Sequence, residues 1–351
     1  MKILFFINHL SDGGAERVTA TLINHLCEQN KVDVVLFCDK ESSYSTNPTI
    51  TFKKIIVNNR IKVIRFVRRI LKIRKTIKDN SPDIIISFLT HTNSYVLIAN
   101  LSLKRKIIVS ERTTLHRKQS LWHWFSRHIL YKFADKVVFV TKSDCKHCSW
   151  LNNKTFIHNP LIFPIATNIE GREKNIIAVG WQSRWHIKGF DLLIKAWAKI
   201  APVHPEWKLQ FAGNNDDNHI SNMAKRYDID NQVEFLGWTD NIDSILRQKS
   251  IYVLSSRNEG FPNSLLEAMS QGCACVAFDC KTGPNEIITN GVSALLVRNG
   301  DSGDLAEKLN LLIEDEQLRR RLATNATNDV RRFEKSEIMR QWDELILSTT
   351  D

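Results

Sequence analysis

The chain has 351 residues, of which 43% are hydrophobic and 25% are charged, as expected of a globular protein. This length predicts two domains, each large enough to bury a core of its own. No apolar run approaches the roughly 20 residues that a transmembrane helix requires, so none is predicted. The seven scattered cysteines favour a reducing cytoplasm over a disulfide framework.

The charge is distributed unevenly along the chain. Residues 1–170 carry 27 Lys and Arg against 12 Asp and Glu, a net charge of +15. Residues 171–351 carry 22 against 26, a net charge of −4, and the two values sum to the formal +11. We therefore expect the first half to meet an anionic partner and the second half not to.

The chain opens with a predicted buried strand over residues 2–7, a glycine turn and a helix over residues 15–28. Gly13 and Gly14 in the turn would let a ligand approach the backbone at a helix N-terminus. The two glycines are therefore candidates for contact with a diphosphate or its sugar, although an ordinary strand-to-helix turn also explains them. The G-x-G-x-x-G spacing of a dinucleotide site is absent.

Residues 60–78 predict a basic amphipathic helix that contains no acidic residue. Cations share one face and apolar residues another: Lys62, Arg65, Arg69 and Lys72 against Ile64, Val67, Leu71 and Ile77. Such a helix could lie on an anionic bilayer or grip the diphosphate of a lipid carrier, and residues 117–132 add interfacial aromatics. A helix packed on the sheet with a solvated basic face is the alternative. Nucleic acid is a competing anion, but no recognition motif accompanies the charge.

Two more buried strands are predicted over residues 83–88 and 106–110, and polar residues follow each of them. Their carboxyl ends should meet at one edge of a parallel sheet, where ligands bind. The candidates for acceptor contact are His91, Asn93, Arg112 and His116. For each of them, a satisfied role in a loop is an equally good explanation.

The second half repeats the pattern of strand, glycine loop and helix over residues 175–197. Arg184 and Lys188 lie four residues apart just before the helix, a spacing that suits the clamping of a diphosphate. A solvated basic loop is the alternative. We read no D-x-D motif in the sequence, interpret the adjacent Asp216 and Asp217 as a polar turn, and expect no metal site, the lone C-x-x-C at residues 145–148 included.

Residues 255–269 follow a short apolar run over residues 251–254 that predicts a buried parallel strand. Glu259 should lie on the loop after this strand, and Pro262 should begin a helix that contains Glu267. Two carboxylates eight positions apart could accept hydrogen bonds from the hydroxyls of the two sugars of one nucleotide-sugar. On these two residues alone, a loop glutamate and a solvated helix glutamate explain the pattern as well.

Residues 259–267 resemble the E-x7-E signature of the family 4 retaining glycosyltransferases. Lys188 with Gly189 resembles the family's K-G pair, whereas Trp181 stands where the family usually has an arginine, and Arg184 is taken as its substitute. The resemblance implies catalytic roles for Glu259, Lys188 and Arg184, and donor contacts from Gly13, Gly14, Arg184, Lys188, Gly237, Glu259, Gly260, Phe261, Pro262, Asn263, Ser264, Leu265 and Glu267.

The resemblance also implies an α/β protein of the GT-B fold, with two doubly wound, Rossmann-like domains facing a cleft. The expected domains are an acceptor-binding domain over residues 1–165, a nucleotide-sugar-binding domain over residues 166–330, and a C-terminal helix over residues 331–351 that returns to the first domain.

The implied reaction moves a hexose or N-acetylhexosamine, from a donor of the UDP-GalNAc or UDP-Gal type, to a polyprenyl-diphosphate-linked saccharide at the cytoplasmic membrane face. No cofactor and no metal are expected. Two alternatives stay open on the residues themselves: a nucleotide-sugar epimerase on the same architecture, and a non-enzymatic basic protein that binds membrane or nucleic acid.

Overall fold

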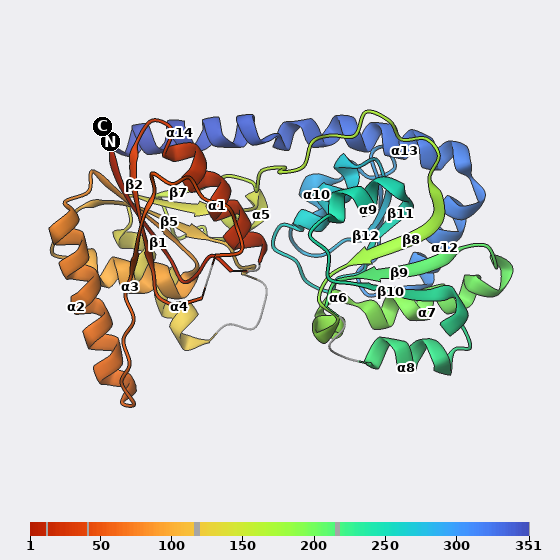
Figure 1. Ribbon diagram of the computed structural model, residues 1–351, viewed down its shortest axis with the longest axis horizontal. Coiled ribbons are helices and arrows are strands. Elements are labelled where there is room, and N and C mark those ends of the chain that lie inside the picture. Colours follow the sequence, from red (N-terminus) through yellow and green to blue (C-terminus); the bar gives the residue numbers. More distant parts are fainter. Residues whose placement is uncertain (12, 41, 116–119, 215–217, 351) are drawn as a thin grey trace. The chain divides into compact units, whose positions relative to one another are not determined.

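The computed structural model describes the chain except for residues 12, 41, 116–119, 215–217 and 351 (Figure 1). It divides into two compact units, which we call unit 1 (residues 1–160 with 335–351) and unit 2 (residues 161–334). Unit 1 contains a sheet in the order β3-β2-β1-β4-β5-β6-β7, and unit 2 contains a sheet in the order β10-β9-β8-β11-β12-β13. All neighbouring strands run parallel, so the predicted α/β fold with two doubly wound sheets is confirmed.

In unit 1, the strands are β1 (Lys2–Ile7), β2 (Lys31–Leu36), β3 (Thr51–Lys54), β4 (Ile84–Phe88), β5 (Lys106–Glu111), β6 (Lys136–Phe139) and β7 (Lys154–Phe156). The α-helices are α1 (Gly14–Leu26), α2 (Lys62–Asn80), α3 (Thr90–Asn100), α4 (Leu121–His128), α5 (Lys142–His147) and α14 (Lys335–Thr350).

In unit 2, the strands are β8 (Glu173–Val179), β9 (Lys208–Ala212), β10 (Val233–Gly237), β11 (Lys249–Leu254), β12 (Ala274–Phe278) and β13 (Leu295–Val297). The α-helices are α6 (Trp185–Lys188), α7 (Phe190–Ile200), α8 (His219–Arg226), α9 (Ile242–Gln248), α10 (Asn263–Ser270), α11 (Pro284–Ile287), α12 (Ser302–Glu314) and α13 (Glu316–Asp329).

The sheet of unit 1 is covered on both faces, which explains why its central strands are continuous apolar runs. Alternate residues of β1 point to opposite faces: Phe5 packs with α1 and α14, whereas Phe6 lies in a separate cluster with α2 and α3. Trp342 of α14 is fully buried in the first cluster, and its ring lies 5.8 Å from that of Phe88 at the end of β4. The last helix thus completes the core of unit 1.

Helix α2 is only partly covered. Ile73 and Ile77 in its second half are buried in the core. Four apolar side chains in its first half are exposed by 38–71%: Val63, Ile64, Val67 and Leu71. The expectation of a single apolar face shared with Ile77 therefore holds only at the carboxyl end of the helix. Among the described residues, no helix is long and apolar enough to span a bilayer.

We predict that Trp342→Ala lowers the unfolding free energy of unit 1 by about 3–5 kcal/mol, because it leaves a large cavity between α14 and the sheet. Urea unfolding followed by fluorescence and circular dichroism would measure the loss. Leu347→Ala on the same helix is the matched control, since Leu347 is 53% exposed and its truncation should change stability by less than about 0.5 kcal/mol. Equal losses in the two variants would contradict the packing of α14 described above.

Candidate donor and acceptor sites

The candidate donor site of unit 2 lies where the strand order reverses. β8 and β11 are hydrogen-bonded neighbours at the centre of the sheet, and the chain continues from them toward opposite edges. The loops after β8 and β11 therefore meet at one carboxyl edge of the sheet, where open α/β sheets bind ligands. Residues 180–189 come from the first loop and residues 255–262 from the second.

Lys188 and Glu259 meet at this edge although they lie 71 positions apart in the sequence. The Lys188 Nζ donates to Glu259 Oε1 at 2.9 Å. The two side chains are 23% and 15% exposed, so the ion pair is shielded but still open to an approaching ligand. The structure thus brings together Lys188 and Glu259, two of the three residues for which the sequence implies a catalytic role.

The two loops are held together by backbone contacts as well as by charge. The Ser255 hydroxyl donates to the Lys188 carbonyl at 2.9 Å, and the Arg257 N–H donates to the Ile187 carbonyl at 2.9 Å. Gly189 adopts a φ of +65°, and a Cβ on it would lie 1.8 Å from the Ser255 carbonyl oxygen. Only glycine permits this approach, which fixes the position of Lys188.

Arg257, which is half-buried, adds an ion pair that anchors the loop. Its two terminal nitrogens donate to the two carboxylate oxygens of Asp191, each at 2.7 Å. Burial by itself raises the pKa of the Asp191 carboxyl, but the hydrogen bonds and the charge of Arg257 outweigh it and lower that pKa below its usual value. Asp191 therefore stays ionised and holds the strand-end loop against the first turn of α7.

The loop that contains Gly283 packs against the backbone of Glu259 and Gly260. A Cβ on Gly283, which has a φ of +98°, would lie 2.5 Å from the Gly260 carbonyl oxygen. The neighbouring Thr282 hydroxyl donates to the Glu259 carbonyl at 2.6 Å. Sequence reasoning found no role for this loop, and its only signal was the Gly-Pro dipeptide at its end.

The remaining donor candidates differ in how they are held. The Tyr252 hydroxyl donates to Ser264 Oγ at 2.8 Å, and burial raises the pKa of Tyr252, so it remains a donor. Pro262 immediately precedes α10 instead of forming its first residue, and Glu267 in that helix is 6% exposed. Leu265 is fully buried, and its N–H donates to the Pro262 carbonyl at 3.1 Å. Its side chain therefore serves packing.

Three further candidates are placed as follows. Arg184 is exposed, and its guanidinium lies 5.6 Å from the Trp181 ring centroid. The Gly237 carbonyl accepts from the Gly213 N–H at 2.8 Å at the end of β10. In unit 1, the Tyr44 hydroxyl accepts from the Gly13 N–H at 3.1 Å and donates to the Gly13 carbonyl at 2.8 Å, which closes the turn before α1.

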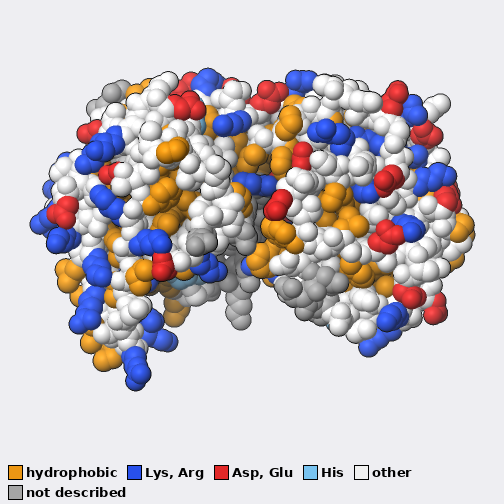
Figure 2. All heavy atoms as spheres, in the orientation of Figure 1, with side chains coloured by type: hydrophobic (Ala, Val, Ile, Leu, Met, Phe, Trp, Pro, Cys, Tyr) orange, Lys and Arg blue, Asp and Glu red, His pale blue; other side chains and the backbone are white. Residues whose placement is uncertain are grey.

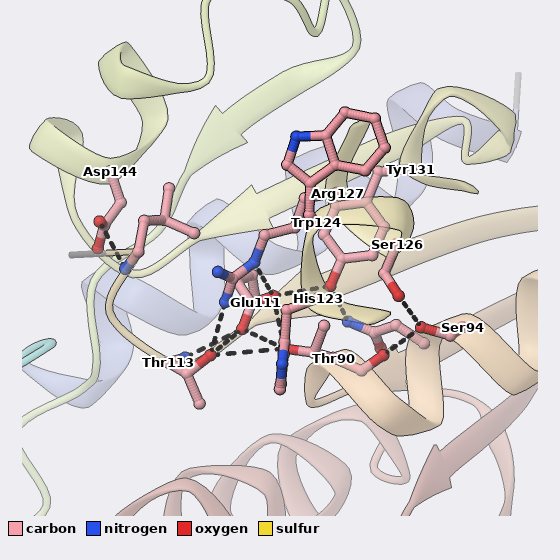
Figure 3. Close-up of polar contacts among 12 residues, drawn as sticks. Thr90, Ser94, Glu111, Thr113, His123, Trp124, Ser126, Arg127, Tyr131 and Asp144 are labelled. Atoms are coloured by element: carbon pink, nitrogen blue, oxygen red, sulfur yellow. Dashed lines mark hydrogen bonds and ion pairs between the residues drawn. The ribbon is translucent and has the colours of Figure 1, made fainter. Parts of the chain in front are cut away.

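A buried carboxylate, Glu111, lies at the end of β5 in unit 1, next in sequence to the acceptor candidate Arg112. Figure 3 shows side chains of Thr90, Arg127 and Tyr131 converging on Glu111 at the end of β5. Glu111 is 1% exposed and accepts from Thr90 Oγ1 at 2.8 Å, Tyr131 Oη at 2.8 Å and Arg127 Nε at 3.2 Å. Nothing in the local sequence distinguishes this glutamate from a solvated loop residue.

Glu111 stays ionised despite its burial. Desolvation raises the pKa of its carboxyl, but the charge of Arg127 and the hydrogen bonds from Thr113, Arg127 and Thr90 together lower it. The same network binds helix to helix, because Ser94 Oγ of α3 lies 2.7 Å from Ser126 Oγ of α4. Glu111 therefore fixes α3 and α4 relative to the sheet.

The predicted acceptor residues have different environments. Asn93 is fully buried and donates to the Ser110 carbonyl at 2.9 Å, which makes it a supporting residue of the Glu111 network. Arg112 donates to Asn159 Oδ1 at 2.7 Å and lies 4.3 Å from the Phe88 ring centroid. Burial lowers the pKa of Arg112 to about 9, which leaves it charged at neutral pH. His91 is exposed beside the ring of His123, and His116 lies outside the described residues.

The described residues contain no group of three or more His, Cys, Asp or Glu side chains that could hold a metal ion. The expectation that the chain lacks a D-x-D spacing is wrong, because Asp228, Ile229 and Asp230 have it. Both aspartates are exposed and lie just before β10, at the amino end of the strand and away from the donor site. Asp216 and Asp217 lie outside the described residues.

The two doubly wound parallel sheets, with a cation–carboxylate pair at the switch point of one of them, define a nucleotide-binding protein of the Rossmann type. Residues 12–153 match the family described as Glycosyltransferase Family 4, and residues 163–329 match Glycosyl transferases group 1. The chain therefore belongs to the family 4 retaining glycosyltransferases, and the predicted family and enzyme class are confirmed.

Several relatives match over nearly the whole chain, and two of them are described here by name. One is the GalNAc-alpha-(1->4)-GalNAc-alpha-(1->3)-diNAcBac-PP-undecaprenol alpha-1,4-N-acetyl-D-galactosaminyltransferase of Campylobacter jejuni, 28% identical over 99% of this chain and 98% of the relative. The other is the amylovoran biosynthesis glycosyltransferase AmsD of Erwinia amylovora, 26% identical over 98% and 99%. The structure of Anabaena Alr3699/HepE in complex with UDP superposes with a TM-score of 0.84, at 21% identity over 99% of this chain and 100% of that one, in agreement with the predicted GT-B fold.

We predict that Gly189→Ala destabilises unit 2 more than Gly171→Ala does. Both glycines have similar backbone angles, with φ of +65° and +68°, so both variants carry the left-handed strain of about 1–2 kcal/mol. Only the Cβ at position 189 meets a backbone oxygen, whereas the one at position 171 meets nothing within 4 Å. Urea unfolding of the two variants would measure the difference, and equal losses would refute the tight contact between the two loops.

We predict that Glu111→Gln lowers the unfolding free energy by about 3–5 kcal/mol at neutral pH, because Arg127 is left buried without its counter-charge. The folded-state pKa of Glu111 lies below its usual 4.5, so its contribution is complete above pH 4.5 and is lost as the pH falls through the folded value. The gap between wild type and variant should therefore narrow below pH 4.5. Glu28→Gln, at an exposed position, is the control, and a gap independent of pH would contradict an ionised Glu111.

Proposed function

We propose that this enzyme moves a hexose or N-acetylhexosamine from a UDP-sugar, of the UDP-GalNAc or UDP-Gal type, to a polyprenyl-diphosphate-linked saccharide. The observation that carries the donor half of the proposal is the Lys188–Glu259 pair at the switch point of the unit 2 sheet. A nucleotide-sugar presents a diphosphate and sugar hydroxyls side by side, and a cation beside a carboxylate matches both groups.

The reaction needs the charge of the departing nucleotide diphosphate to be neutralised while positive charge develops on the sugar. In our proposal, Lys188 and Arg184 bind the diphosphate, together with N–H groups near the start of α10. Glu259 then accepts hydrogen bonds from the sugar hydroxyls, and Glu267 accepts them from the ribose. Without donor, the ion pair keeps Lys188 and Glu259 aligned, so binding exchanges one partner for another and moves neither loop.

The proposed donor and acceptor draw support from the relatives. The Campylobacter jejuni relative is named for the transfer of N-acetylgalactosamine to an undecaprenol-diphosphate-linked saccharide, and Alr3699/HepE was solved with UDP. UDP-GalNAc and UDP-Gal are therefore the first donors to test, with an undecaprenol-diphosphate-linked saccharide as the first acceptor.

A lipid-linked acceptor requires the enzyme to work at a membrane. We propose a peripheral location on the cytoplasmic face, with residues 60–78 meeting anionic lipids. Figure 2 shows hydrophobic side chains among Lys and Arg side chains in the region of α2. The exposed apolar residues of this helix include Val63 and Leu71, and such a mixture is the composition of an interfacial helix.

We predict that Glu259→Gln lowers transfer and slow hydrolysis of the accepted UDP-sugar by at least about 100-fold, because a neutral amide cannot hold the sugar hydroxyls in the same way. Lys188→Gln should reduce both donor affinity and turnover. Glu307→Gln, at an exposed position on α12, is the control and should retain full activity.

The measurement is a panel of UDP-GalNAc, UDP-Gal and other nucleotide sugars, scored by thermal shift and by hydrolysis with and without EDTA. We expect one donor to stabilise the protein and EDTA to have no effect. Near-normal turnover of Glu259→Gln would refute the assignment of this residue, and a complete loss in EDTA would refute a metal-independent reaction.

A further inference from the structure

Arg112, which immediately follows β5, carries a charge that the donor site does not use. Its guanidinium lies 4.3 Å from the Phe88 ring centroid and 5.7 Å from that of Trp342. Its Nη1 donates to Asn159 Oδ1 at 2.7 Å. All four residues belong to unit 1, so one compact unit sets the surroundings of this guanidinium.

Two nitrogens of the Arg112 guanidinium, Nε and Nη2, are shielded from solvent and have no hydrogen-bond partner among the residues that the structure describes. They lie on one edge of the planar group, so their N–H bonds form a fork of the kind with which arginine holds two oxygen atoms. The Trp342 Nε1 is likewise shielded and has no partner there. Three such N–H donors thus belong to two side chains that pack on the same Phe88 ring. Because buried donors are normally satisfied, this arrangement indicates a ligand that supplies acceptor atoms.

The charge of Arg112 has no counter-charge within the described part of the chain, where no carboxylate forms an ion pair with it. Its sequence neighbour Glu111 lies on the other face of the sheet and is held there by Arg127 and Tyr131. Burial alone lowers the pKa of Arg112 to about 9, so the guanidinium is charged at neutral pH. A shielded cation without a counter-ion is unfavourable, which indicates that the acceptor atoms belong to an anion.

The chemistry of this site favours a carboxylate over other anions. One guanidinium supplies one positive charge, which a carboxylate neutralises and a phosphate dianion exceeds. The two N–H bonds of the fork lie in one plane and match the two oxygens of a carboxylate, whereas a halide offers a single acceptor centre. Phe88 and Trp342 are fully buried, and a wall that excludes water strengthens charge-assisted hydrogen bonds.

We propose that the Nε–Nη2 fork of Arg112 binds a carboxylate group, near the N–H of Trp342. Arg112 as a residue is only half-buried, so part of it is open to solvent although the fork is shielded. The carboxylate has two possible sources, a small free carboxylate ion or a sugar acid within the acceptor saccharide. The second source rests on the proposed function, because it makes the acceptor an acidic glycan, whereas the first does not.

The test uses the full chain with sodium acetate and sodium glucuronate as probes, glucose as the neutral match and inorganic phosphate as the competing anion. Binding is measured by calorimetry at constant ionic strength. Arg112→Gln removes the fork, and Arg105→Gln removes an exposed cation just before β5, so the two variants are matched in net charge. We expect Arg112→Gln to weaken carboxylate binding at least about tenfold and Arg105→Gln less than about twofold. Arg112→Lys keeps the charge without the fork and should weaken it at least about fivefold.

Thermal unfolding separates a ligand-binding arginine from a structural one. In a buffer free of carboxylates, Arg112→Met should keep or raise the melting temperature, because an apolar side chain replaces a shielded cation that has no counter-charge. Added acetate should then raise the melting temperature of wild type and of Arg105→Gln but not that of Arg112→Met. A lower melting temperature of Arg112→Met in the carboxylate-free buffer would show a structural role and overturn the proposal.

Equal weakening in Arg112→Gln and Arg105→Gln would overturn the proposal, and so would tighter binding of phosphate than of acetate. Glucuronate bound at least about tenfold more tightly than acetate, with no binding of glucose, would support a sugar acid of the acceptor. Equal affinities for the two would support a small free carboxylate ion. Wild type tested in parallel with UDP-GalNAc and UDP-Gal separates the two levels of inference. Donor binding without carboxylate binding would overturn this site alone, whereas carboxylate binding without donor binding would support the site and refute the proposed function.

Discussion

The parallel pairing of β8 with β11 is the constraint on which the donor site depends. Because both strands end at one edge, the loops after them are forced together, and Gly189 lets the backbones approach until Lys188 reaches Glu259. The Arg257–Asp191 pair and the Gly283 loop then hold this arrangement from two sides. The site is therefore rigid before any ligand arrives, which is what electrostatic stabilisation of a leaving diphosphate requires.

The arrangement of helices in unit 1 depends on a buried charge, the carboxylate of Glu111. An ionised Glu111 in the interior is tolerated only because Arg127, Tyr131 and two threonines satisfy it together. Such a network contributes less to net stability than to specificity, since it fixes α3 and α4 in one position against β5.

The uneven charge of the two halves of the chain corresponds to a difference in how their cations are paired. In unit 2, cations such as Lys188, Lys249 and Arg257 are paired with carboxylates, and the surface is close to neutral. On α2, the cations lack such partners and lie among exposed apolar side chains. The cations of the two units thus differ in their partners: those of unit 2 form ion pairs, whereas those of α2 do not.

The sequence by itself determined the alternating strands and helices, the glycine turns, the basic helix and the glutamates eight positions apart, because each is a local pattern of burial period, turn chemistry or spacing. Only the tertiary structure decided that Lys188 pairs with Glu259, that Gly283 supports that loop, and that Glu111 is a buried centre with Asn93 as its support. It also left the first half of α2 uncovered and built a cavity from α2, α3 and α4. These features depend on contacts between residues far apart in the chain, and a local pattern indicates which face of a helix is apolar but not what packs against it.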